Sequence, residues 1–397
     1  MPRFEPFRAL RYSPDIEPLD ALVAPPYDVL SAEDVAGYGA KSPHNIVHID
    51  VPAGGSERYA RAGALLRQWS ADGVLTSDDE PSFTVYRTRF VDATGARRDL
   101  VGVIGALEVV DEGAGGVLPH ERTTPKASTD RLDLTRATRA NLSPVWGLSL
   151  AAGLSDLLGA PGEPVGEVTV DGVVHRVERI SDPERMAMIG DRVSGDDVLI
   201  ADGHHRYGVA RVYRDEIRDA ASRTDDDDPA ESAELTLAFV GELIAEQLSV
   251  EAIHRLYTGI EPADLHEALA EHFSIEPMPP PTPATLAAME SEGFLVLVGR
   301  GATSRLTPKP EAFDGVRALD GAWLEHALAG RSVEVAYQHG IDETVAAVDR
   351  GDAIAAVLIR PVSVAEIERT AREGLLMPPK STFFTPKLRT GFVIRPL

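Results

Sequence analysis

One short stretch of the sequence concentrates side chains that can bind charge and move protons, Ala201-Asp202-Gly203-His204-His205-Arg206-Tyr207. It follows an apolar run, residues 198–201, which predicts a buried strand, and it opens a pattern typical of a helix. The first backbone N–H groups of such a helix lack partners and face the positive end of its dipole. Gly203 would let a ligand approach closely, and Arg206 could add a bidentate charge. The stretch therefore predicts a site for an anion.

The same spacing allows a plainer interpretation, a helix capped by Asp202 with its histidines at the surface. Adjacent residues on a helix point about 100° apart, so His204 and His205 are badly placed to chelate one metal ion together. The following residues at three- and four-residue spacing define one apolar helix face: Tyr207, Ala210, Tyr213 and Ile217.

Composition removes several kinds of chemistry. The 397 residues include no cysteine, which excludes disulfides, thiolate nucleophiles and cysteine-ligated zinc. Acidic residues number 63 against 39 basic ones, giving a net charge of −24 that disfavours nucleic acid as a partner. No apolar stretch is long enough to span a membrane, and no signal peptide is apparent, so we expect a cytoplasmic protein without a membrane partner. A local basic pocket could still bind a nucleotide.

Two further segments carry candidate residues upstream of this stretch. Residues 119–122 include His120 and Glu121, but Pro125 follows and no second histidine appears, which argues against the zinc-protease pattern. A basic run follows with alternative roles in phosphate binding or in a salt-bridged surface helix: Lys126, Arg131, Arg136 and Arg139. Asn141 could cap a helix end or orient a ligand.

A third candidate segment, residues 377–387, lies near the end of the sequence and is rich in hydroxyls and lysines. Lys380 could close over a phosphate as a point charge, with Ser381 and Thr382 as hydrogen-bond donors. The alternative is an ordinary edge strand.

The pattern of apolar runs predicts a mixed α/β fold. Residues 45–50 are expected to form a strand and residues 57–69 a helix, while residues 82–90 and 98–109 should form paired strands. Asp171-Gly172 predicts a hairpin. Five prolines within residues 277–283 suggest a boundary between a catalytic region, residues 1–276, and a C-terminal α/β lobe, residues 277–397, that closes over the site.

The stretch from Asp202 to Arg206 resembles the phosphate-gripping motif of the ParB/sulfiredoxin-like superfamily, in the version found in free serine kinases. Five segments in order also resemble the bacterial family called domain of unknown function 1015: residues 23–30, 118–123, 139–144, 202–206 and 377–384. The resemblance implies a ParB/sulfiredoxin-like core with large insertions and a C-terminal α/β extension. Sulfiredoxin chemistry would need a cysteine, and ParB-type partitioning would need a DNA-binding domain, so the metabolite-kinase branch remains.

This resemblance implies a kinase that moves a phosphoryl group from ATP or ADP, bound with Mg²⁺, to a small hydroxylated metabolite such as free L-serine. Residues 203–206, with Lys126, Arg131 and the segment 380–382, would hold the phosphates. Asp202 would act as general base or as a Mg²⁺ ligand.

The resemblance also implies which residues contact the substrate. Glu121 would orient the substrate beside His120 as a second catalytic group, and Tyr27, Asp28 and Asn141 would contact it. Two other functions stay open, a nucleotide-binding regulator and a metal-dependent phosphoester hydrolase using His120, Glu121, Asp202 and His204.

Overall fold

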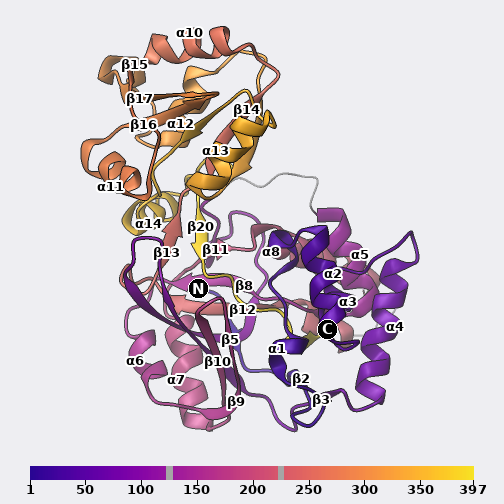
Figure 1. Cartoon of the computed structure of the whole chain (residues 1–397). Coiled ribbons are helices and arrows are strands. Elements are labelled where there is room, and N and C mark those ends of the chain that lie inside the picture. The colour runs from indigo at the N-terminus through magenta and orange to yellow at the C-terminus, as the bar shows by residue number, and fades with distance from the viewer. Residues whose placement is uncertain (122–127, 222–227) are drawn as a thin grey trace. The chain divides into compact units, whose positions relative to one another are not determined.

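The computed structural model describes residues 1–121, 128–221 and 228–397, and helices and strands alternate through them (Figure 1). This confirms the mixed α/β class. The chain divides into two compact units, a larger one of residues 1–249 with 384–397 and a smaller one of residues 250–383. The division differs from the expected boundary at 276/277, because the proline-rich residues 277–283 join a strand to a helix inside the smaller unit.

The larger unit contains the following strands: β1 Phe4–Glu5, β2 Leu10–Tyr12, β3 Leu75–Ser77, β4 Phe83–Val91, β5 Arg97–Glu108, β6 Val117–Leu118, β7 Ala140–Asn141, β8 Val145–Ser149, β9 Glu163–Val170, β10 Val173–Ile180, β11 Val198–Asp202, β12 Leu235–Glu242 and β21 Arg395–Pro396. Nine of the described strands form one sheet in the order β6-β11-β8-β12-β5-β4-β10-β9, with β1 beside β5. Strand β11 lies parallel to β6 and antiparallel to β8. The strand that leads into the motif is therefore held on both sides.

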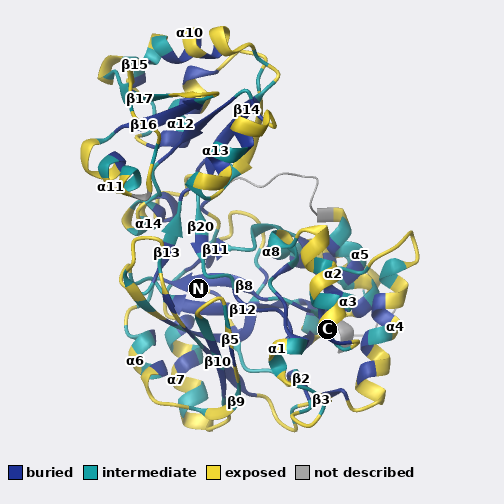
Figure 2. Cartoon of the chain, in the orientation of Figure 1, coloured by how far each residue is buried: buried dark blue, intermediate teal, exposed yellow. Residues whose placement is uncertain are grey.

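The helices of the larger unit are α1 Leu19–Leu22, the 3₁₀ turn η1 Tyr27–Val29, α2 Ala32–Lys41, α3 Val47–Asp50, α4 Arg58–Ala71, α5 Ser128–Thr138, α6 Leu154–Gly159, α7 Pro183–Val193, α8 His204–Ala221 and α9 Asp228–Ala233. Apolar side chains of α6 and α7 pack with the central strands in one core cluster. A second cluster joins α3, α4 and α5 near the N-terminal segments. Figure 2 shows the strands of this unit buried and the outer faces of its helices exposed.

Local pattern explains most of these elements. Strands β4 and β5 pair as predicted, and Asp171 and Gly172 adopt positive φ between the paired strands β9 and β10. The predicted strand at residues 45–50 is wrong, because this segment turns and forms α3. Asn45 starts the turn: its Oδ1 accepts a hydrogen bond from the Val47 N–H, and a short apolar run alone does not distinguish a strand from a buried helix.

The smaller unit has its own sheet and core. Its strands are β14 His254–Thr258, β15 Phe273–Pro277, β16 Leu295–Gly299, β17 Ala302–Pro308, β18 Glu334–Gln338 and β19 Ala355–Leu358. They pair antiparallel in the order β15-β17-β16-β19-β14-β18. The unit's helices are α10 Pro262–His272, α11 Pro283–Glu292, the 3₁₀ turn η3 Pro310–Phe313, α12 Asp320–Ala327, α13 Ile341–Arg350 and α14 Val364–Arg372.

The chain passes between the units twice, and two short paired strands, β13 Ser249–Glu251 and β20 Phe383–Thr385, contain the crossing points. Among the described residues, no helix combines the length and apolar character that crossing a bilayer requires.

Candidate functional site

The predicted strand–glycine–helix turn forms as expected. Strand β11 is buried up to Ala201, and α8 begins at His204. Gly203 between them has φ +87°, a conformation that side chains rarely adopt. A Cβ at this position would also lie 3.0 Å from the Cζ and Nε atoms of Arg206. Glycine is therefore required for two reasons: it permits the positive φ of the turn, and it leaves space for the guanidinium of Arg206.

Two cations converge on the carboxylate of Asp202. Lys387 Nζ lies 2.6 Å from Oδ1, and Arg206 Nη2 lies 2.5 Å from Oδ2. Burial favours the protonated form of Asp202, but Lys387 and Arg206 outweigh it and hold the pKa of this carboxyl well below its ordinary value. Asp202 is thus ionised and organises both cations at the N-terminal end of α8.

Arg206 has a buried donor, Nε, that no described residue satisfies. Its Nη1 donates to the Pro144 carbonyl and its Nη2 to Asp202, whereas the buried Nε has no hydrogen-bond partner among the described residues. A buried donor without an acceptor costs free energy, on the order of 1–3 kcal/mol. This donor sits beside the Gly203 turn, where an anion could supply the missing acceptor.

Lys387 belongs to the C-terminal strap, which we define as residues 384–397. The strap is fixed on both sides of the lysine. Phe384 is buried with its ring 5.6 Å from that of Trp146, and Thr390 exchanges backbone hydrogen bonds with Ala24. Strand β21 at its end pairs with β7. Lys387 lies in the hydroxyl- and lysine-rich segment 377–387, but its role could not be predicted from the sequence, because only the folded strap brings it to Asp202.

His120 is fully buried next to the motif. Its Nδ1–H donates to the Ile200 carbonyl at 2.6 Å, and its ring lies 4.9 Å from that of His204 in an edge-on arrangement. Burial lowers the pKa of His120 to about 4, so the ring is neutral at pH 7. This burial favours a supporting role beside His204 over the direct catalytic role predicted from the sequence.

Other predicted residues lie around this centre in different ways. His204 and His205 are partly exposed on the first turn of α8, and Glu121 is partly buried next to His120. The role of Glu121 stays a prediction. Lys126 lies outside the described residues.

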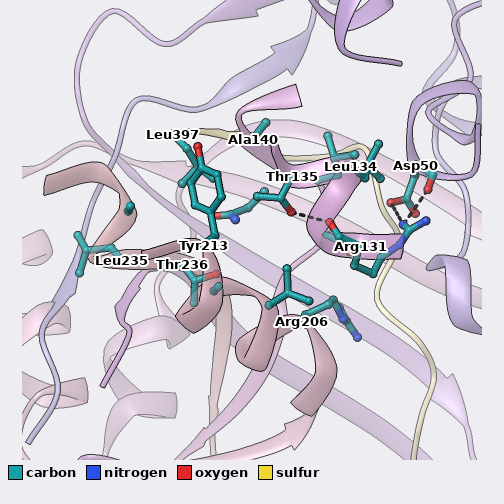
Figure 3. A pocket seen from close by; sticks show the side chains of 16 residues that line it. Asp50, Arg131, Leu134, Thr135, Ala140, Arg206, Tyr213, Leu235, Thr236 and Leu397 are labelled. Carbon is teal, nitrogen blue, oxygen red and sulfur yellow. Dashed lines mark hydrogen bonds and ion pairs between the residues drawn. The ribbon is translucent and has the colours of Figure 1, made fainter. Parts of the chain in front are cut away.

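A cavity of about 50 Å³ adjoins the motif and is shown in Figure 3. Its wall includes Arg206 together with Arg131, Asp50 and Asn141. Arg131 is buried, and its Nη1 donates to the backbone oxygen of Asp50 at 2.7 Å and to its Oδ1 at 3.1 Å. The volume has room for water-sized groups and does not hold a whole nucleotide. Asp50 was missed from the sequence because the segment was predicted to be a strand.

Three predicted substrate residues lie near this cavity. The guanidinium of Arg131 lies 4.1 Å from the centre of the Tyr27 ring, and burial raises the pKa of Tyr27 to about 12. Asp28 is exposed, and its charge acts on Arg206. Asn141 lines the cavity while its Oδ1 accepts from the Leu237 N–H at 3.0 Å. The structure therefore brings these three residues into the surroundings of Arg206.

The residues predicted to close over the phosphate, Lys380, Ser381 and Thr382, belong to the smaller unit. There Arg255 donates to the Lys380 carbonyl at 2.9 Å, and the buried Ser381 hydroxyl donates to the Pro378 carbonyl at 2.7 Å. Lys380 has φ +57°, so this segment turns before β20 begins. Phosphate binding by the three residues stays a prediction.

The chemistry of the donor set does not fit a metal ion at Asp202. Both carboxylate oxygens already contact cations, and the described residues contain no cluster of three or more histidine and acidic side chains that could hold a metal. The metal-dependent hydrolase therefore gains no support from the described residues.

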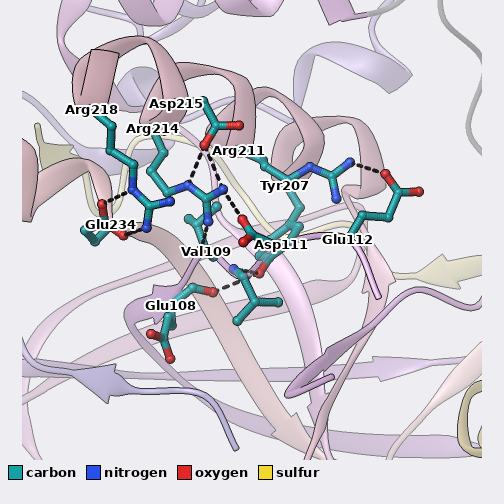
Figure 4. A network of polar contacts seen from close by, with 11 residues as sticks. Glu108, Val109, Asp111, Glu112, Tyr207, Arg211, Arg214, Asp215, Arg218 and Glu234 are labelled. Carbon is teal, nitrogen blue, oxygen red and sulfur yellow. Dashed lines mark hydrogen bonds and ion pairs between the residues drawn. The ribbon is translucent and has the colours of Figure 1, made fainter. Parts of the chain in front are cut away.

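Helix α8 is anchored along the rest of its length by a polar network (Figure 4). The Tyr207 hydroxyl donates to the Glu108 carbonyl and accepts from the Val110 N–H, at 2.9 and 2.8 Å. Farther along, Arg214 pairs with Asp111 and Asp215. These contacts fix the helix to the end of β5, so the orientation of its first turn is set by the sheet.

The fold and this site define a mixed α/β protein with a cation-rich turn between a buried strand and a long helix. Within that class, the chain belongs to the family described as protein of unknown function (DUF1015), which it matches over residues 4–322. No curated protein matches the chain.

Three solved structures show distant likeness. A conserved hypothetical protein from Pyrococcus furiosus has 12% identity and a TM-score of 0.39, covering 70% of this chain and 92% of that one. A free serine kinase in complex with AMP has 12% identity and a TM-score of 0.38, covering 70% and 89%. SbnI with a C-terminal truncation, from Staphylococcus aureus, has 13% identity and a TM-score of 0.39, covering 74% and 87%.

Proposed function

We propose that the turn at Gly203 binds the phosphates of a nucleotide, ATP or ADP, and that the protein transfers a phosphoryl group from it to the hydroxyl of a small metabolite. The observation that carries this proposal is the unsatisfied Nε of Arg206, which lies beside a glycine turn where two cations already converge. A phosphate oxygen would satisfy that donor, and the helix N-terminus adds positive potential.

In this proposal Asp202 serves as the anchor that keeps Arg206 and Lys387 together before the nucleotide arrives. Its carboxylate balances their charge, because two buried cations without an anion would repel each other. Phosphate oxygens then share these cations. Phosphoryl transfer depends mainly on such positioning and charge stabilisation, so little else is required from the turn.

The acceptor side of the site lies at the cavity lined by Arg206 and Asn141. Arg206 therefore faces both the proposed phosphate site and a small polar space. A transferase needs this arrangement, since donor phosphate and acceptor hydroxyl must meet. Free L-serine is the first acceptor to test because the sequence resemblance points to it, and Glu121 is the candidate for orienting it.

The test combines binding and chemistry on the full chain. We expect ATP or ADP to bind by calorimetry, and phosphorus NMR to show a new phosphomonoester when a panel of hydroxylated metabolites is added. The Gly203→Ala variant should lose nucleotide binding, since its Cβ meets the Arg206 guanidinium. Gly208→Ala on the same helix is the matched control, because no atom lies within 4 Å of the added Cβ.

The outcomes separate the competing functions. Saturable nucleotide binding without a phosphorylated product from any hydroxyl compound would support a nucleotide-binding regulator instead of a kinase. Equal nucleotide affinity in the Gly203→Ala and Gly208→Ala proteins would contradict the proposed phosphate site altogether.

A further inference from the structure

The buried carboxylate of Asp50 lines the cavity on the other side of Arg206. It is the last residue of α3 and is 3% exposed. Arg131 holds Oδ1, whereas no hydrogen bond from a described residue reaches Oδ2. Asp50 is therefore fixed in orientation by one oxygen while the other can accept a hydrogen bond from a ligand.

The charged and titratable groups around Asp50 come from three elements. Arg131 and Asp130 face it from α5, Arg206 from α8, and Tyr27 and Asp28 from η1. Burial raises the pKa of Asp50, and the opposing effect of Arg131 is smaller. The pKa of Asp202 is shifted in the opposite direction: Lys387 and Arg206 contact its two oxygens and lower its pKa despite its burial. Of these two carboxylates, Asp50 is the stronger base, because its pKa is raised whereas that of Asp202 is lowered.

We propose that Asp50 is the general base of the transfer, with its Oδ2 accepting the hydroxyl hydrogen of a small acceptor bound in the cavity beside Arg206. This inference rests on the proposed function. It also limits the acceptor to a small metabolite that presents a hydroxyl group, because the cavity beside Arg206 is small, about 50 Å³. Asp202 is then a positioning residue.

The reaction balances without a further reactant. The acceptor oxygen forms a bond to the terminal phosphorus of the nucleoside polyphosphate as its proton moves to Asp50 Oδ2. The bond between that phosphorus and the bridging oxygen breaks, and its electron pair stays on the leaving nucleotide. The products are a phosphomonoester, a nucleotide shortened by one phosphate, and a proton that Asp50 later releases to water.

The test compares Asp50→Asn with Asp130→Asn. Both aspartates contact Arg131, but the Asp130 side chain is 44% exposed and lies outside the cavity wall. We expect Asp50→Asn to lower kcat by about 100-fold or more, the usual range for a lost base, while the nucleotide Kd changes by less than about 3-fold. Asp130→Asn should retain kcat within about 3-fold. Equal losses in both variants would mean that Asp50 only positions Arg131, which would overturn the proposal.

A measurement on the unmodified protein covers the case in which Asp50→Asn does not fold. The base must be deprotonated, so kcat/KM should fall as pH is lowered through a pKa above the ordinary aspartate value of about 3.9. A profile that stays flat down to pH 4 would overturn the assignment. If both the unmodified protein and the Asp50→Asn variant transfer phosphate at similar rates, the role of Asp50 is rejected while the proposed function stands. Nucleotide binding without transfer or hydrolysis in the unmodified protein would reject the proposed function, and Asp50's role with it.

Discussion

The two ends of helix α8 use the same residue types in different ways. In its second half, arginines pair with carboxylates of their own: Arg214 with Asp111 and Asp215, and Arg218 with Glu234 (Figure 4). At its first turn, Arg206 shares the carboxylate of Asp202 with Lys387, and its buried Nε has no hydrogen-bond partner in the part of the chain that the structure describes. Matched pairs of this kind attach a helix to its neighbours, whereas an unsatisfied buried donor requires a ligand or water.

This contrast gives a criterion for separating structural from functional arginines within one helix. Removing a structural arginine should change stability and leave ligand affinity alone. Removing a ligand-binding arginine should lower ligand affinity and leave stability nearly unchanged. Four substitutions test the criterion, in order of expected effect.

Arg206→Ala should have the largest effect, a loss of nucleotide affinity of about 100-fold, equivalent to about 2.7 kcal/mol. The variant removes the bidentate group and the unsatisfied Nε together. Calorimetric titration with ADP and ATP measures the change. Arg211→Ala, five residues farther along the helix with an exposed partner in Glu112, is the control and should bind normally. Similar affinities in the two variants would remove Arg206 from the ligand site.

Asp202→Asn should destabilise the protein by about 2 kcal/mol at pH 7, because it leaves two partly buried cations without their anion. The folded-state pKa of Asp202 is lowered, so its contribution is present above the unfolded value of about 3.9 and disappears as pH falls through the folded pKa. Urea unfolding of both proteins should therefore show a difference that shrinks below pH 4. Equal unfolding free energies of the two proteins at pH 7 would contradict the role of Asp202 as an anchor.

Lys387→Met should weaken nucleotide binding by about 10-fold, equivalent to about 1.4 kcal/mol. Methionine keeps most of the buried aliphatic stem, so the strap should still dock. Lys41→Met is the control, since Lys41 also belongs to the larger unit but contacts the Tyr38 ring. If Lys387→Met bound nucleotide as tightly as the control, the strap would have no part in the site.

Arg218→Ala should have the smallest effect. Arg218 is about half exposed in its pair with Glu234, which limits the cost to about 1 kcal/mol or less in unfolding free energy. Thermal unfolding measures this change, and nucleotide titration should show none. A clear loss of affinity here would break the distinction between the two ends of the helix.

The sequence alone predicted the features that depend on neighbouring residues. The apolar run before Asp202, the glycine and the periodic face of α8 are local, and the structure forms all three, with Tyr207 and Tyr213 buried. Local pattern failed at residues 45–50, where a short apolar run formed α3 instead of a strand.

Other features of the site could not be read from the sequence because they depend on distant contacts. Lys387 meets Asp202 only through the path of the strap, and Asp50 reaches Arg206 through the packing of α3 and α5. The unit boundary was missed for a related reason. A unit that the chain leaves at residue 249 and re-enters at 384 has no single linker, so a proline-rich stretch inside the smaller unit was mistaken for one.

The C-terminal strap also bears on the order in which the molecule can be assembled. Synthesis runs from the N-terminus, so the motif leaves the ribosome well before Lys387, with the whole smaller unit made in between. A nascent chain halted within the smaller unit would carry the glycine turn without its lysine, and β7 without its partner β21. Nucleotide affinity should therefore appear late in biosynthesis, when the strap has docked.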